Sequence, residues 1–453
     1  MAGSRRRLSL VAAGIAGVLA LAACSSGDTG TGEGGGDGAA PAADGEATTL
    51  DMWVFAELHA DYYEQMAAEW NEQNSDRPVD LEVTVYPYQD MHNKLQLAAN
   101  SGKGLPDVVD IEVSKFGNFV TEDGRTPLMD LSDAAKPYQD DIVQARLDLY
   151  SRADKIYGFP MHVGAFVAFY NAALMEEAGI DYTTITTWDD FEKAGTAYNQ
   201  ATGKAFGIAS TTVNFVQPLI TAQMGGDFFD ADGNVAVNNP TVVKALELEQ
   251  RMLKAGAISP IPGGSPDDEQ AFGVINSGDY AAVVYPAWFS SRFVDYMPDL
   301  AGDVAIAPAP VVEGGDVATI GGGGTGTAVV ESSEHKDFAA EWLAFAKLSP
   351  EANVAVWEVL GFDPVNMSVW EDEAVTHDPE NKFNKYFRTN MFDVLNEVKE
   401  EIGHFEGFAN PNLPAVNNVF TTVTWTEIFE NGVAPQDALD QAQRDLENEI
   451  GSK

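Results

Sequence analysis

Apolar residues follow two alternating periods along residues 50–113. The segments 50–55, 80–86 and 105–113 are short and rich in apolar residues, and they predict β-strands. Between the first two, apolar side chains fall four apart over residues 62–70, which predicts one face of a helix, and a second helix is predicted over 91–99. Because strand and helix alternate, we expect a parallel sheet with covering helices.

A continuous apolar run follows this series. Tyr157-Gly158-Phe159-Pro160 is prone to turns, and residues 161–171 are almost all apolar as far as Tyr170-Asn171. The run lies between two α/β series, so we interpret it as a crossing between two lobes, with a strand over 166–170. Residues 304–310 predict a strand that runs back beside it. The first half of the run predicts a hinge that also carries binding residues.

The second series has clear helix start signals. Thr187-Trp188-Asp189-Asp190 has the spacing of a capping box, and Asn239-Pro240 starts another helix. Residues 280–285 predict a strand that leads directly to Trp288. Beyond residue 333 the pattern is helical, with Phe338, Trp342 and Phe345 on one face.

Ligands of open α/β sheets bind beyond the carboxyl ends of the strands. This rule selects Phe55–His59 after the first strand, with Glu57 and His59, and Asp110–Glu112 after the third. The alternative for the two acids is a solvated loop position among 70 carboxylates. An indole at Trp288 offers a flat face for a sugar ring, and a core tryptophan is the alternative there.

Residues 320–327 formally contain G-x-G-x-x-G, at Gly321, Gly323 and Gly326. A dinucleotide site needs a helix after these glycines, whereas a strand is predicted at Ala328-Val329-Val330, and no Lys-Ser/Thr follows for a P-loop. We therefore expect the glycines to allow a close approach of backbone to a ligand or a neighbouring strand.

The N-terminus has the features of a lipoprotein signal peptide over residues 1–23. Arg5-Arg6-Arg7 precedes an apolar run from Leu8 to Ala20, which is short for a membrane span. Leu21-Ala22-Ala23-Cys24 resembles a bacterial lipobox, and Cys24 is the one cysteine of the chain. We expect acylation of Cys24, palmitate included. Both Sec and twin-arginine export stay open.

Residues 24–47 are mostly Gly, Ala, Thr and acidic residues, which predicts a flexible tether. The protein would then be held on the outer face of the cell membrane by its lipid. Loss of residues 1–23 removes three arginines and no acid, which takes the formal charge from −44 to −47. Such a charge disfavours nucleic acid as a partner.

Several segments together resemble the extracellular solute-binding proteins of ATP-driven (ABC) importers, the family that includes maltose-binding protein. In chain order they are Leu105–Val109, Tyr157–Pro160 with Phe169–Asn171, Thr187–Phe191, Gly278–Ala282 with Trp288, Gly322–Gly326 with Glu341–Leu343, and Ala434–Leu439. Tyr88–Leu95, His162–Gly164, Met297–Leu300 and Leu360–Pro364 further resemble the members that bind arabinose-containing oligosaccharides.

The resemblance implies an α/β, type II periplasmic-binding-protein fold, in which each lobe is a mainly parallel sheet flanked by helices. We expect one lobe over residues 48–163 and 306–330 and the other over 164–305 and 331–453. The family pattern puts eight residues near the ligand: Glu57, His59, Glu112, His162, Gly164, Trp288, Gly324 and Asp363. It also implies a monomer without cofactor or metal that captures a sugar or oligosaccharide and delivers it to the permease subunits of the importer.

Three alternatives stay open. A surface glycoside hydrolase needs two suitably spaced carboxylates, for which 70 acidic residues give no specific support. A metal-binding lipoprotein is disfavoured because the six histidines lack short ligand spacing. Capture of a polyamine or a peptide is possible on the same fold.

Overall fold

Two separate β-sheets organise the chain in the computed structural model, which describes residues 45–121, 125–315 and 317–450. The predicted signal peptide, Cys24 and nearly all of the predicted tether lie outside these residues. Among the described helices, none is both long and apolar enough to span a bilayer.

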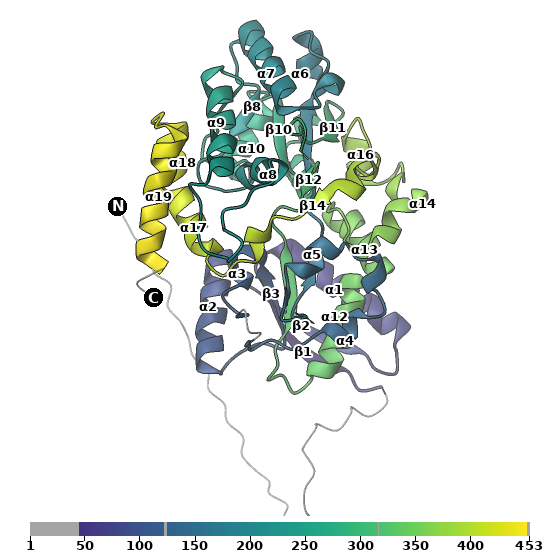
Figure 1. Cartoon of the computed structure of the whole chain (residues 1–453). Helices are drawn as coiled ribbons and strands as arrows, with labels where there is room; N and C mark the ends of the chain where they lie inside the picture. The colour runs from purple at the N-terminus through teal and green to yellow at the C-terminus, as the bar shows by residue number, and fades with distance from the viewer. Residues whose placement is uncertain (1–44, 122–124, 316, 451–453) are drawn as a thin grey trace, which may run out of the picture. The chain divides into compact units, whose positions relative to one another are not determined.

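The first sheet is five-stranded, in the order β2 (Val79–Val85), β1 (Thr48–Val54), β3 (Val108–Glu112), β13 (Thr325–Val329) and β6 (Phe159–Pro160). β1 is parallel to β2 and β3, whereas β13 is antiparallel to β3 and β6. The strands and helices predicted over residues 50–113 are therefore confirmed. Helix α1 (Glu57–Gln73) buries Tyr62, Met66 and Trp70, the apolar face that their spacing predicted, and lies beside this sheet (Figure 1).

The second sheet joins β10 (Ala282–Pro286), β7 (Phe166–Asn171) and β11 (Val304–Pro308). β7 is buried throughout, and β11 runs back beside it, as predicted. Both neighbours of β7 are antiparallel to it, so the prediction of a mainly parallel sheet in each lobe is wrong for this one. Both β10 and β11 run opposite to β7, and the apolar pattern of a strand buried on both faces does not reveal its direction. A parallel pair, β8 (Gly207–Ala209) and β9 (Ile258–Pro260), completes this region.

Local signals explain the longer helices. Helix α7 (Trp188–Thr202) begins at the predicted capping box, in which Thr187 and Asp190 exchange hydrogen bonds. Asn239 caps α9 (Pro240–Lys254), and Ser349 caps α13 (Pro350–Ala355), each with proline at the first helical position.

The remaining elements are short, apart from α2, α12 and α19. The helices are α2 (Tyr88–Ser101), α3 (Val113–Phe116), α4 (Ser132–Ala135), α5 (Gln144–Asp148), α6 (Ala172–Glu177), α8 (Val216–Gln223), α10 (Glu269–Asn276), α11 (Ser290–Tyr296), α12 (Lys336–Leu348), α14 (Glu373–Thr376), α15 (Lys382–Tyr386), α16 (Met391–Val398), α17 (Leu413–Val419), α18 (Trp425–Phe429) and α19 (Pro435–Ile450). The strands are β4 (Ser151–Arg152), β5 (Lys155–Ile156), β12 (Thr319–Ile320) and β14 (Ile402–Gly403).

Helix α12 contacts the first sheet and its helices. It packs on α1, α4, β6 and β13, and Trp342 lies 6.2 Å from Tyr63 of α1, measured between ring centres. The predicted division assigns residues 331–453 to the second lobe, but α12, which lies in this range, packs on the first sheet. The apolar face at Phe338, Trp342 and Phe345 was predicted, but its spacing does not say which sheet buries it. The division as a whole stays a prediction.

Candidate functional site

A cavity of about 690 Å³ lies where strands of both sheets end. Five of the eight residues expected near the ligand line it, namely His59, Glu112, His162, Trp288 and Gly324. The residues around the cavity come from α1, the start of α2, the end of β3, the residues after β10, and the segment 408–421.

Strand register explains why distant residues meet here. β13 pairs antiparallel with β3, and Thr325 lies opposite Glu112, so the glycines that precede β13 reach the carboxyl end of β3. In the second sheet, Pro286 at the end of β10 lies opposite Phe166 at the start of β7. Trp288 therefore lies close to the residues that enter β7. The strand-end rule holds for both sheets.

Glu112 has one carboxylate oxygen engaged by protein. Oε2 accepts hydrogen bonds from the Tyr88 hydroxyl (3.1 Å), from the Ser114 backbone N–H (2.9 Å) and from the Ser114 hydroxyl, whereas Oε1 accepts none of these. Burial raises the pKa of Glu112, and the donors at Ser114 and Tyr88 oppose that rise. The arrangement fixes the side chain of Glu112, which lines the cavity, and none of these three hydrogen bonds uses Oε1.

His92 connects the backbones of Tyr88 and Glu112 through hydrogen bonds. Its Nδ1 bonds the Tyr88 carbonyl (2.7 Å), and its Nε2 accepts from the Glu112 backbone N–H (3.2 Å). An acceptor at Nε2 requires a neutral ring, and burial lowers the pKa of His92 to about 4.

His162 has unmet hydrogen-bonding capacity. The residue is 5% exposed, and both ring nitrogens are buried without a partner among the described residues. Burial lowers the pKa of His162 well below its usual range, and the nearby positive charges of Arg146 and Lys347 add to this effect. A neutral imidazole offers one donor and one acceptor, and leaving either unpaired is costly. The ring is suited to a polar ligand or water.

Trp288 combines features of a core residue and of a binding residue. The residue is 9% exposed, and its Nε1–H donates to the Gly322 carbonyl at 3.0 Å. The Arg292 guanidinium lies 5.5 Å from the centre of the ring and pairs with Asp267 at 2.7 Å. The ring is held in one orientation at the cavity wall.

Three of the expected residues do not line this cavity. Glu57 is exposed at the first position of α1, two residues before His59. Residues two apart on a helix face different sides, so the turn that brings His59 to the cavity directs Glu57 elsewhere.

Gly164 and Asp363 hold the crossing itself. The Asp363 carboxylate accepts from the backbone N–H groups of Gly164 (3.0 Å) and Ala165 (2.8 Å), and burial raises the pKa of Asp363 to about 7. Gly164 has φ +69°, and a Cβ there would collide with the Gly322 carbonyl. These two residues connect crossing segments rather than face the cavity.

Other residues on the cavity were not predicted. They are Tyr88, Gln89, Thr212 to Phe215, Tyr285, Asp267, Arg292, Phe408 and Asn417, among others. The strand-end rule would have found Tyr88, which follows β2, and the residues after β8. The segment around Phe408 and Asn417 follows no strand signal in the sequence.

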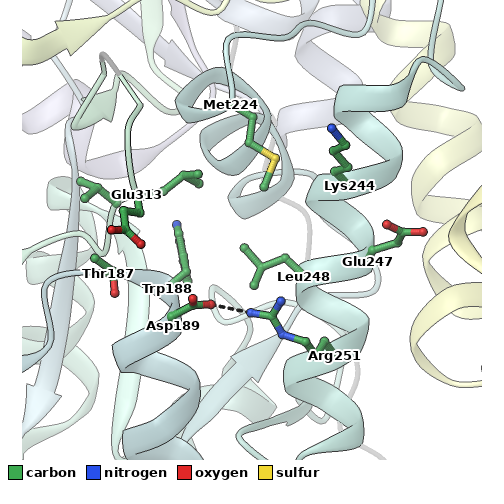
Figure 2. A pocket seen from close by; sticks show the side chains of 11 residues that line it. Thr187, Trp188, Asp189, Met224, Lys244, Glu247, Leu248, Arg251 and Glu313 are labelled. Atoms are coloured by element: carbon green, nitrogen blue, oxygen red, sulfur yellow. Dashed lines mark hydrogen bonds and ion pairs between the residues drawn. The ribbon is translucent and has the colours of Figure 1, made fainter.

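A second hollow, of about 480 Å³, lies between α7 and α9 (Figure 2). Its lining includes Trp188, Leu248 and Val311, and Arg251 closes its rim by pairing with Asp189 at 2.6 Å. None of the expected binding residues lies there. The residues Thr187 to Asp190 therefore have a structural explanation, as helix cap and core. Within residues 45–121, 125–315 and 317–450, no group of His, Cys, Asp and Glu side chains could hold a metal ion.

Comparisons with known proteins agree with this geometry. The family described as bacterial extracellular solute-binding protein matches residues 56–353, which is more than half of the chain. This chain is a member of that family. Two arabinooligosaccharide-binding proteins, from Halalkalibacterium halodurans and Bacillus subtilis, are each 38% identical to it. Each match covers 88% of this chain, with 89% and 92% of the relatives.

Solved structures show the same fold. The sugar-binding protein MalE from Xanthomonas citri has a TM-score of 0.74 at 18% identity, over 89% of this chain and 98% of that one. The cyclic alpha-maltosyl-1,6-maltose binding protein from Arthrobacter globiformis has a TM-score of 0.71 at 22% identity, over 88% and 98%. The predicted two-lobed class is confirmed. Because the matching family consists of binding proteins, this solute-binding protein is not an enzyme.

Proposed function

We propose that this solute-binding protein captures an arabino-oligosaccharide in the cavity between the two sheets and delivers it to the permease of an ABC importer. The relatives named for arabinooligosaccharides cover nearly all of the chain at 38% identity, which supports the ligand class. The chemistry of the cavity wall carries the argument further.

The cavity wall suits a neutral, hydroxyl-rich ligand. The indole of Trp288 and the rings of Tyr88 and Phe215 supply flat faces, and Oε1 of Glu112 and the nitrogens of His162 supply polar atoms. Among the described residues on this wall, Arg292 is the one Lys or Arg, and Asp267 pairs with it. An acidic or phosphorylated ligand would find no unpaired cation here.

The remaining parts of the proposal concern place and assembly. We place the protein on the outer face of the membrane, exported with residues 1–23 as signal and held by lipid on Cys24. The ligand would stabilise closure of the two lobes, taken as 48–163 with 306–330 and α12, and 164–305 with the rest of 331–453, and the permease would recognise that closed monomer.

A thermal-shift panel tests the ligand class. We expect arabinotriose to raise the melting temperature of the purified protein in proportion to the logarithm of its concentration, by an amount equivalent to about 2.7 kcal/mol at 100 times Kd. Maltotriose and galactotriose are matched neutral controls and should act more weakly. Isothermal titration calorimetry then gives Kd directly.

The same panel distinguishes the alternatives. Stabilisation by spermidine or a tripeptide but by no sugar would favour the polyamine or peptide reading. Release of free arabinose from the oligosaccharide would show hydrolysis and contradict a binding role. The expected result is an arabinotriose that is recovered intact.

A further inference from the structure

Asp110 is a buried carboxylate directly behind the cavity. It lies on β3 two residues before Glu112, so both side chains point to the same face of the sheet. Asp110 has no exposed surface, and three side chains hydrogen-bond to it: His59 Nδ1 at 2.9 Å, the Tyr63 hydroxyl at 2.8 Å and the Thr327 hydroxyl at 2.8 Å.

Three neighbouring elements, α1, β13 and α12, supply the groups around Asp110. His59 and Tyr63 are four residues apart on α1 and therefore share one helix face. Thr327 lies directly opposite Asp110 in the pairing of β13 with β3. From α12, the Lys347 ammonium group approaches the Tyr63 hydroxyl at 3.2 Å. All four groups that surround Asp110 are thus fixed by regular secondary structure.

Asp110 is ionised in this environment. Burial by itself would raise the pKa of Asp110, but the hydrogen bond and the electrostatic attraction of His59, followed by the charge of Lys347, outweigh burial and lower it. Lys347 is 1% exposed, and burial lowers the pKa of its ammonium group to about 7. A buried carboxylate of this kind is stable only with such partners.

An ionised carboxylate can only accept hydrogen bonds, and this determines the form of His59. Nδ1 of His59 must carry a hydrogen, so in the neutral ring Nε2 is a bare acceptor. Nε2 makes no hydrogen bond with any residue that the structure describes, although the ring lines the cavity. Phe55 packs edge-on against the ring, with 5.1 Å between centres, and restricts its rotation.

We propose that Asp110 is a positioning residue of the binding site, which holds His59 with Nδ1–H turned inward and presents Nε2 to the cavity as the acceptor for a ligand hydroxyl. Asp110 itself touches no ligand. This inference rests on the proposed function for its ligand, because it needs a hydroxyl-bearing molecule in the cavity. The tautomer of His59 can be measured without any ligand, so the two ideas can fail separately.

The first experiment is ¹⁵N NMR of the full-length protein with labelled histidine rings, at about pH 9, where imidazole rings are neutral. The expected result is His59 in the Nδ1–H tautomer, assigned by loss of its signals in His59→Asn. An Nε2–H tautomer would overturn the proposal. Addition of saturating arabinotriose should then shift the Nε2 resonance, and an unmoved Nε2 resonance would overturn the ligand contact.

The second experiment is the variant Asp110→Asn, whose amide can present either oxygen or nitrogen to Nδ1. We expect a mixed His59 tautomer together with a loss of arabinotriose affinity of about 10-fold or more. Unchanged affinity overturns the proposal. So does a loss of affinity with His59 still wholly Nδ1–H, because Asp110 would then act only on the fold.

Glu249→Gln is the matched control, since it also converts a buried carboxyl group to an amide. Glu249 lies on α9, is 3% exposed, and is absent from the cavity wall. The affinity of the Glu249→Gln variant for arabinotriose should stay within about twofold of that of the parent protein. An equal loss in both variants would show that any conversion of a buried carboxyl group to an amide weakens binding, and would overturn the specific role of Asp110.

Discussion

The indole of Trp288 is held before any ligand arrives. Its N–H bonds the Gly322 carbonyl at 3.0 Å, and Arg292 lies against the ring. A ring that needs no reorientation loses little conformational freedom on binding, which favours affinity. The same hydrogen bond connects the ring to the glycines that precede β13. Trp288 is therefore both a wall of the cavity and a contact between the two sheets.

Replacement of Trp288 by alanine should weaken sugar binding strongly while the fold is kept. We expect Kd for arabinotriose to rise about 30-fold, as for a buried aromatic hot spot worth ~2 kcal/mol. Calorimetry measures Kd, and a melting curve checks the fold. Trp288→Phe keeps an aromatic face but not the N–H, and it should fall between alanine and the parent. Parental affinity in Trp288→Ala would remove this residue from the site.

Glu249 is a buried acid that the binding site does not use. Its Oε1 accepts from Gln217 Nε2 at 3.1 Å, whereas its Oε2, Gln217 Oε1 and Thr221 Oγ1 have no partner among the described residues. Burial raises the pKa of Glu249 to about 8. The protonated carboxyl group buries no charge and carries a hydrogen-bond donor that a carboxylate lacks.

Glu249 predicts a loss of stability as pH rises. The ordinary pKa of such a group is 4.5, so between about pH 4.5 and about pH 8 the folded chain keeps a proton that the unfolded chain releases. The unfolding free energy should fall across this window. Glu249→Gln removes this titration. The unfolding free energy of the variant minus that of the parent should therefore be larger at pH 8 than at pH 5, by on the order of 2–4 kcal/mol. Urea unfolding at both pH values checks this; an equal difference at both would contradict it.

At the residue scale, the sequence predicted the positions that follow from strand ends. His59, Glu112 and Trp288 lie at the cavity because each closely follows a strand, and the rule needs only the apolar pattern. Glu57 shows its limit, since the rule cannot say which side of the following helix faces the ligand. Asp363 follows no strand, and its contact with Gly164 depends on how three crossings meet, which no local pattern encodes.

At the element scale, the glycine segment 321–324 has a steric explanation. Arg146, 2% exposed, lies across it and donates to the Gly323 carbonyl at 2.5 Å. A Cβ on Gly321 or Gly324 would collide with the Arg146 guanidinium. We expected these glycines to allow a close approach of backbone to a ligand or a neighbouring strand, whereas at Gly321 and Gly324 the close neighbour is the side chain of Arg146.

Alanine substitutions at a glycine on the cavity wall and at a glycine within a helix should change the unfolding free energy in opposite directions. Gly324 has φ +113° and no space for a methyl group, so Gly324→Ala should lower the unfolding free energy by about 2–3 kcal/mol. Gly273 lies within α10 with open space around its Cβ position, so Gly273→Ala should raise it by about 0.5–1 kcal/mol. Chemical denaturation measures both. A stable Gly324→Ala would show that the segment tolerates ordinary residues.

Helix α12 shows what periodicity leaves undetermined at this scale. Its apolar face was correct, yet the face packs on α1 and β13 rather than with the second lobe. A stripe of apolar residues indicates that one side of a helix is buried, but it does not identify the element against which that side packs. The sequence could not predict the strand directions in the second sheet for a similar reason. A strand that is buried on both faces has the same apolar pattern in a parallel and in an antiparallel sheet.

At the scale of the whole molecule, the excess of acidic residues follows the surface rather than the site. Of the chain's 70 Asp and Glu residues, Glu112 and Asp267 are those that line the cavity among the described residues. The net charge thus supports solubility and disfavours anionic partners, but it does not select the ligand. We inferred the family and fold from the order of many short segments along the chain. Each segment alone is weak evidence, and no single motif would have been sufficient.

The proposed lipid anchor concerns the whole molecule, because it would decide where binding takes place. Cys24 lies outside the described residues, so the test is chemical: Cys24→Ala should abolish incorporation of labelled palmitate and release the protein from the membrane fraction. Arabinotriose affinity should be unchanged, since Phe55 is the first of the described residues on the cavity wall. A Cys24→Ala protein that stays in the membrane fraction after a high-salt wash would show a hold other than the acyl chains. Such a hold could not be electrostatic, because a chain with net charge −44 is repelled by anionic lipid.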